Sequence, residues 1–69
     1  MIELVFAVSQ EADGGFVAEC LTHDIITQAD SWEALRGNVR EAVAAYFFDT
    51  APPPAIRLHL RRDELLLTA

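Results

Sequence analysis

The chain has 69 residues, of which 52% are hydrophobic, and its net charge is −6 at pH 7. This length suits one small domain, which buries only about 60% of its unfolded surface and is marginally stable alone. The single cysteine excludes an internal disulfide, and no Cys/His set has the spacing of a metal site. We therefore expect a homo-oligomer to supply extra stability, with no metal and no cofactor.

The first residues do not resemble an export signal, because Met1 leads into an apolar segment without a basic start or a cleavage site. No apolar run approaches the roughly 20 residues that cross a bilayer. Together with the unpaired cysteine, this predicts a cytoplasmic protein with no membrane partner. The excess of acids disfavours nonspecific binding to nucleic acid, since contacts from Lys and Arg to phosphates supply most of that affinity.

Two segments near the N-terminus, residues 2–10 and 16–21, alternate with the period of two that is typical of β-strands. The intervening sequence EADGG predicts a hairpin turn. A two-residue loop would mix the apolar and polar faces, whereas a three-residue loop, Ala12–Gly14, pairs Phe6 with Cys20 on one buried face. We therefore expect the three-residue loop, with its glycine in the left-handed conformation.

A short β-branched run at residues 25–28 predicts a third strand, and residues 31–48 have the periodicity of a helix. Its apolar side chains fall on one stripe: Trp32, Leu35, Val39, Ala42, Val43, Tyr46 and Phe47. We expect Asp30 to be the N-cap, with Glu33 reaching back to it. Gly37 costs about 1 kcal/mol relative to Ala in a helix interior. A close approach of the helix backbone to the sheet would explain the presence of glycine here, and so would a position on the exposed side of the helix.

Pro52–Pro54 end the helix, and residues 55–62 alternate as a fourth strand before a tail at residues 63–69. A meander of the first three strands, followed by a right-handed crossover through the helix, places the fourth strand parallel to the first. The sequence thus predicts an α+β fold of the type β-β-β-α-β, with a four-stranded mixed sheet in the order 3-2-1-4 and one helix on one face.

Side-chain parity assigns each strand residue to one of two faces. The face toward the helix is expected to carry Ile2, Leu4, Phe6, Val8, Phe16, Ala18, Cys20, Ile56, Leu58 and Leu60. The opposite face is expected to carry Val5, Ala7, Val17 and Leu21 with Glu3, Glu19, Arg57, His59 and Arg61. No predicted element is left to cover this second face. Its arginines are expected to pair with Glu3 and Glu19 or with another subunit.

The motifs EADGGFVAEC and DIITQADSWEAL, in this order and spacing, resemble the HicB-type antitoxin-like domain. The shared pattern is an acidic-Gly-Gly-aromatic hairpin, then a strand with Thr, then Asp-Ser at the start of a helix. The resemblance extends from about Ile2 to Leu60. It implies a partial ribonuclease H-like fold, which agrees with the strand order expected above.

The resemblance also implies a function, which is to bind and mask a partner toxin, a small basic protein that cleaves RNA. Full antitoxins of this type carry a C-terminal DNA-binding segment, but only nine residues follow Leu60 here. Direct DNA binding is therefore not expected, and a component of a transcriptional regulator is the second alternative function. Short chains of this kind are sometimes labelled as oxoacid dehydrogenase subunits, but the sequence shows no thiamine diphosphate motif, and this activity is not expected.

Several polar residues raise the question of catalysis, because ribonuclease H-like folds hold divalent metals with clustered carboxylates. Asp13, Asp24 and Asp30 each have a local role, in turns or at the helix start. His23 is expected to be a solvated turn residue and Cys20 a small core residue. A degenerate nucleic-acid-binding or metal-binding remnant is the alternative function, and it requires Asp13 or Asp24 to bind Mg²⁺ or Mn²⁺.

The leading hypothesis is a non-enzymatic, antitoxin-like interaction module that self-associates and binds another protein. The uncovered face, the helix end and the leucine-rich tail supply the candidate interface. Its residues are Val5, Val17, Leu21, Phe48, Arg57, His59, Arg61, Leu65, Leu66 and Leu67.

Overall fold

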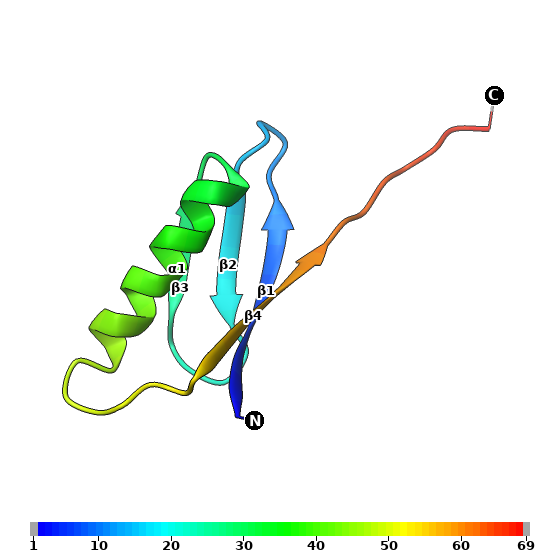
Figure 1. Cartoon of the computed structure of the whole chain (residues 1–69). Coiled ribbons are helices and arrows are strands. Elements are labelled where there is room, and N and C mark those ends of the chain that lie inside the picture. The colour runs from blue at the N-terminus through cyan, green and yellow to red at the C-terminus, as the bar shows by residue number, and fades with distance from the viewer. Residues whose placement is uncertain (1, 69) are drawn as a thin grey trace.

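The computed structural model describes residues 2–68, and its elements are β1 (Glu3–Gln10), β2 (Phe16–Cys20), β3 (Ile26–Ala29), α1 (Trp32–Tyr46) and β4 (Ala55–Arg61) (Figure 1). The strands form one mixed sheet in the order β3-β2-β1-β4. In this sheet β1 pairs antiparallel with β2 and parallel with β4. The predicted α+β architecture and strand order are therefore confirmed. Within the described residues, no helix is both long and apolar enough to cross a membrane.

The β1–β2 hairpin has the register that the buried face requires. Phe6 lies opposite Cys20, and the Glu11 amide donates a hydrogen bond to the Gly15 carbonyl at 2.6 Å. Three residues remain in the loop, and Gly14 has a φ of 95°, a conformation that residues with a Cβ rarely adopt. The three-residue loop was predicted correctly, because any even loop would have turned one strand over.

The N-terminus of α1 differs from the prediction by one residue. Ser31, in extended conformation, is the N-cap, and its hydroxyl accepts a hydrogen bond from the Ala34 amide at 3.1 Å. The expectation that Asp30 caps the helix was wrong. Both residues are good caps by type, and the cap is the one whose backbone lies directly before the first helical turn.

The C-terminus of α1 is two residues shorter than predicted. The helix ends at Tyr46, and the amide of Phe47, the C-cap residue, donates to the Val43 carbonyl. Tyr46 was expected in the core, but 45% of it is exposed, and its ring packs on Phe47 at 5.1 Å. Of the last two residues of the stripe, Tyr46 therefore lies outside the core, and Phe47 packs against it.

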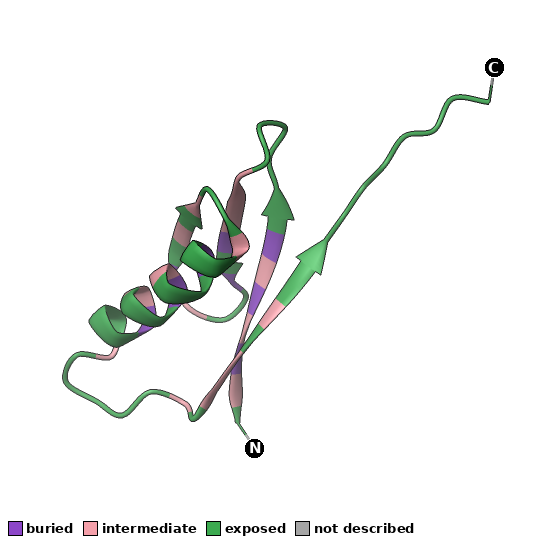
Figure 2. Cartoon of the chain, turned by 45° about the horizontal axis from the view of Figure 1, so that its top comes forward, coloured by how far each residue is buried: buried purple, intermediate pink, exposed green. Residues whose placement is uncertain are grey.

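The core lies between α1 and the inner half of the sheet, where the buried residues in Figure 2 gather. Its buried residues are Leu4, Phe6, Val8, Ala18, Cys20, Ile25, Leu35, Val39 and Val43. Ile25 lies just before β3, not within it, and its carbonyl accepts from the Cys20 amide.

The helix packs mainly over β2 and β3, so the core does not extend evenly across the sheet. Asn38 helps to fix this position, since its side-chain amide donates to the Gln28 carbonyl at 2.9 Å. Leu60, on β4, was predicted on the covered face and is therefore 45% exposed. Ile2, also predicted there, is 75% exposed because it lies before the start of β1. The face of each residue was predicted, but its distance from the helix was not.

Candidate protein-binding surface

The face of the sheet opposite α1 carries no other element of the chain among the described residues (Figure 1). Residues that pair directly across a sheet share a face, so the register defines its rows. One row runs from His59 through Ala7 and Glu19 to Ile26. We call this surface the open face.

Two further rows lie on the open face, besides the pair of Glu3 and Ala55 at its end. The first joins Arg61, Ser9, Val17 and Gln28 across all four strands. The second joins Arg57 to Val5, with Leu21 alongside, because the Leu21 amide donates to the Val5 carbonyl at 3.0 Å. The sheet residues of the predicted interface therefore do share one surface. They are Val5, Val17, Leu21, Arg57, His59 and Arg61.

The polarity of the open face changes from one edge to the other. The β4 edge carries Arg57, His59 and Arg61, all exposed, and the middle carries half-buried apolar residues of β1 and β2. At the β3 side, Leu21 and Ile26 are 65% and 64% exposed. This is an apolar strip interrupted by the exposed Glu19, with a basic margin, a composition suited to the core and rim of a protein interface.

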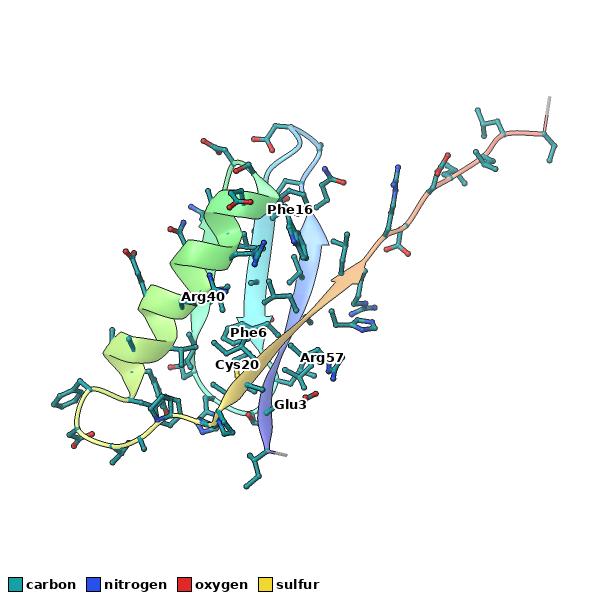
Figure 3. All side chains as sticks on the ribbon, in the orientation of Figure 1. Glu3, Phe6, Phe16, Cys20, Arg40 and Arg57 are labelled. Carbon is teal, nitrogen blue, oxygen red and sulfur yellow. The ribbon has the colours of Figure 1, made fainter. Side chains whose placement is uncertain are left out.

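One basic residue of this margin is already paired. The Arg57 guanidinium donates from Nε to Glu3 Oε1 at 2.5 Å and from a terminal nitrogen to Oε2 at 3.2 Å (Figure 3). This hydrogen bond, with the positive charge of Arg57, lowers the pKa of the Glu3 carboxyl below its ordinary value of 4.5. The predicted cross-strand pairing with Glu3 is confirmed for Arg57.

Phe48 and the leucines of the tail do not lie together. Phe48 is 83% exposed in the connector after α1, and Leu65, Leu66 and Leu67 are 74–86% exposed beyond β4. Figure 1 shows the connector and the C-terminal segment at opposite ends of the molecule. The sequence grouped them by polarity, but the structure presents two separate apolar sites.

The residues considered for catalysis or metal binding have local surroundings. Asp13 Oδ1 accepts from the Gly15 amide at 3.0 Å, which explains it as a loop residue. Cys20 is 6% exposed within the core, as expected. Across residues 2–68, no three His, Cys, Asp or Glu side chains gather closely enough to hold a metal ion.

His23 was expected to be solvated, and this was wrong. Its ring is half-buried against Tyr46 and Phe47, at centroid distances of 5.5 and 5.4 Å. Its Nδ1 lies 2.8 Å from the Thr22 hydroxyl. The turn before β3 is thus packed against the end of α1, a contact between distant residues that the local sequence does not reveal.

Ile26 is a member of the open face that sequence reasoning missed. The predicted third strand included it, but its face was not assigned. Side chains alternate along a strand, so an Ile25 that points to the core requires Ile26 to point to the opposite face. The sequence therefore did contain the information that places Ile26.

The chain is similar to two proteins that are both named UPF0150 protein. The one from Thermotoga maritima is 36% identical over 50 residues, which cover 72% of this chain and 71% of that protein. The one from Archaeoglobus fulgidus is 38% identical over 52 residues, which cover 75% of this chain and 79% of that protein. No family model matches the chain, and no solved structure matches it. Identity at this level over most of both chains shows that the protein belongs to the UPF0150 family.

Proposed function

We propose that this UPF0150 protein is a HicB-like, non-enzymatic interaction module with a partial ribonuclease H-like fold. The hairpin and helix-start motifs that carry the resemblance lie on β1–β2 and at the start of α1. The strand order β3-β2-β1-β4 with one helix supports the fold. Asp13 accepts a hydrogen bond within the hairpin loop, and Cys20 is buried in the core. These structural roles support a function in binding rather than in catalysis.

The observation that carries the proposal is the open face. Val5, Ala7 and Val17 are half-buried there, while Leu21 and Ile26 are about two-thirds exposed. These apolar side chains surround the exposed Glu19, and exposed apolar groups gathered around a polar residue are typical of interaction sites. The open face is therefore the surface that binds the partner.

The partner is a small basic protein, and by the HicB resemblance it is an RNA-cleaving toxin that this chain masks. The net charge of −6 favours the long-range encounter with a basic partner. On the open face itself, exposed Glu19 is available to such a partner and Arg57 is paired with Glu3, whereas Arg61 must meet polar or acidic groups of the partner. The apolar strip then supplies the buried contact area once the two proteins have met.

The protein also self-associates. The extended segment after β4, residues 63–68, exposes three consecutive leucines far from the core. An exposed apolar segment of this kind gains free energy when it is buried against another copy. The two apolar sites, open face and C-terminal segment, allow self-association and partner binding to use different surfaces.

The proposal predicts that a reading frame next to the gene of this chain encodes a short basic protein, and the test is to co-express the two. We expect the two proteins to co-elute in size exclusion with a fixed stoichiometry, and the chain to relieve toxicity and RNA cleavage. The double variant Leu21→Asp/Ile26→Asp is expected to lose the complex and the relief together.

The matched control is Thr50→Asp/Ala51→Asp, which adds the same charge at exposed positions of the connector and is expected to keep both. If Leu21→Asp/Ile26→Asp retains full binding while folded, the open face is not the binding surface. If the wild-type chain neither binds the basic protein nor relieves its activity, this partner assignment is wrong.

A further inference from the structure

A groove separates α1 from β4 on the covered side of the sheet. It arises because α1 packs over β2 and β3 and leaves the helix side of β4 exposed. The groove has a volume of about 280 Å³ and is lined by Trp32, Arg36, Val39, Arg40, Ile56 and Leu58. Ile56 and Leu58 are only half-buried, so its floor is apolar and accessible.

The helix side of this groove is positively charged. Arg36 and Arg40 are four residues apart on α1, so both project on the same side of the helix, and both are exposed. Figure 3 shows Arg40 on α1. Within residues 2–68 the salt bridge found is between Arg57 and Glu3, so neither groove arginine is in an ion pair there. The groove thus combines an apolar floor with two available cations.

After β4 and the single cation Arg62, residues 63–67 have the complementary chemistry. Asp63 and Glu64 precede Leu65–Leu67, and all five are exposed. The segment continues outward from β4, away from the sheet (Figure 1). This extension agrees with a radius of gyration of 13.9 Å, compared with the roughly 11 Å typical of a compact chain of this length.

We propose that residues 63–67 of one copy bind in the α1–β4 groove of a second copy. This inference rests on the self-association part of the proposed function and identifies its two surfaces. Asp63 and Glu64 pair with Arg36 and Arg40, and leucines of the segment cover the apolar floor. If each copy binds the segment of the other, the exchange forms a closed two-fold dimer.

The dimensions of the two parts agree. Five extended residues span about 16 Å, at roughly 3.3 Å per residue. The groove follows α1 from Trp32 to Arg40, a length of about 12 Å at 1.5 Å per residue. In an extended segment alternate side chains point the same way, so Asp63, Leu65 and Leu67 share one side and Glu64 and Leu66 the other. Leu65 and Leu67 can therefore enter the floor together, with Asp63 on the same side, while Glu64 meets the arginines from the outer side of the groove.

The direction of the chain favours the groove of a second copy over its own. To reach its own groove, the segment would have to reverse directly after Arg61. Of the five residue types that most favour tight turns, residues 61–68 contain only one, Asp63. In the structure the segment instead continues in the direction of β4.

The test uses two charge-reversal variants of the full chain, studied by sedimentation velocity and light scattering at tens of micromolar. We expect the wild type to be a dimer of twice 7.6 kDa. Arg36→Glu/Arg40→Glu places acids in both the groove and the segment, so it is expected to be a monomer. Asp63→Arg/Glu64→Arg places cations in both, so it is also expected to be a monomer.

The decisive sample is an equimolar mixture of these two variants. Each groove then meets a segment of opposite charge on the other variant, so we expect the dimer to return. Trp32 is the only tryptophan of the chain and lines the groove, so its emission should shift to shorter wavelength in the wild type and in the mixture. Neither variant alone should show this shift.

Two control variants are used. One keeps the positive charges of the groove, and the other reverses two negative charges outside residues 63–67. Arg36→Lys/Arg40→Lys retains the cations, and Asp24→Arg/Asp49→Arg makes the same change as the segment variant at other exposed positions. Both are expected to remain dimers. Circular dichroism checks that every variant is folded.

Each other result contradicts the inference in a different way. If both folded charge-reversal variants remain dimers, the groove and segment are not the contact, although self-association stands. If the mixture stays monomeric while the chain with all four substitutions regains the shifted Trp32 emission as a monomer, the segment binds its own groove. A monomeric wild type refutes the inference and self-association together, but not partner binding by the open face, which the co-expression test measures separately.

Discussion

The Glu3–Arg57 pair at the edge of the open face predicts a measurable titration shift. The two hydrogen bonds favour the carboxylate, so the pKa of Glu3 lies below 4.5. A carboxyl whose pKa is lowered by folding stabilises the fold above its unfolded pKa, and this stabilisation is lost as the pH falls through the lowered value. We expect a carbon-detected NMR titration of Glu3 to give a midpoint below 4.5.

In the Arg57→Met variant, the Glu3 midpoint is expected to return to about 4.5. Arg57 is exposed and Glu3 is partly exposed, so added salt should weaken the shift in the wild type. A Glu3 midpoint that is the same in wild type and variant would show that the pair does not form in solution.

Gly37 presents a simple case of a residue that costs stability without structural need. A Cβ at this position would meet no atom within 4 Å, and the residue is exposed on α1. Of the two explanations open from the sequence, close approach to the sheet is therefore excluded. We expect Gly37→Ala to raise the free energy of unfolding by about 1 kcal/mol in urea denaturation. An unchanged or lower value would contradict the placement of this residue.

The start of α1 gives a prediction at the scale of the element. Because the Ser31 hydroxyl accepts from the Ala34 amide, Ser31→Ala should lower the free energy of unfolding by about 1 kcal/mol. Asp30→Ala is the matched control, and it should cost clearly less, since Asp30 is not the cap. Thermal or urea unfolding of the two variants decides between them, and a larger loss for Asp30→Ala would reverse the assignment.

Each strand could be predicted from the sequence because its pattern is local. The alternation in residues 2–10 and the parity of the hairpin fix which side chains share a face, and hence the register. The parity of β4 likewise predicted that Arg57, His59 and Arg61 lie together. The open face follows from these local rules, apart from Ile26, whose face was not assigned.

The lateral position of α1 could not be predicted in the same way. A stripe of apolar residues says that a helix covers a sheet, but not over which strands it lies. Tertiary contacts decide this, such as the hydrogen bond from Asn38 to the Gln28 carbonyl and the packing of His23 on Tyr46. For the same reason the exposure of Leu60 and the groove beside β4 were missed.

At the scale of the whole molecule, the core is small and two apolar surfaces remain outside it. Truncation of one fully buried side chain should therefore have a large effect. Leu35→Ala, at a position with 0% exposure, is expected to cost 2–5 kcal/mol, of the order of the whole stability of a domain of this size. Urea unfolding at fixed protein concentration measures this, because self-association adds to apparent stability. A loss below about 1 kcal/mol would contradict the central position of Leu35.

The two surfaces account for how a small acidic protein can associate in two ways. The open face, with its apolar strip, is proposed for the basic partner, and the α1–β4 groove for the segment of a second copy. They lie on opposite sides of the sheet, so occupation of one leaves the other accessible. We therefore expect the variant Leu21→Asp/Ile26→Asp to lose its partner and keep its oligomeric state.

The measurement that most directly tests the open face as the partner surface is a methyl NMR titration with the small basic protein. We predict shifts for the methyl groups of Val5, Val17, Leu21 and Ile26, and unchanged signals for Leu35 and Val39 in the core. Shifts confined to Leu65–Leu67 or to the connector, with the open-face methyl groups unchanged, would contradict this account.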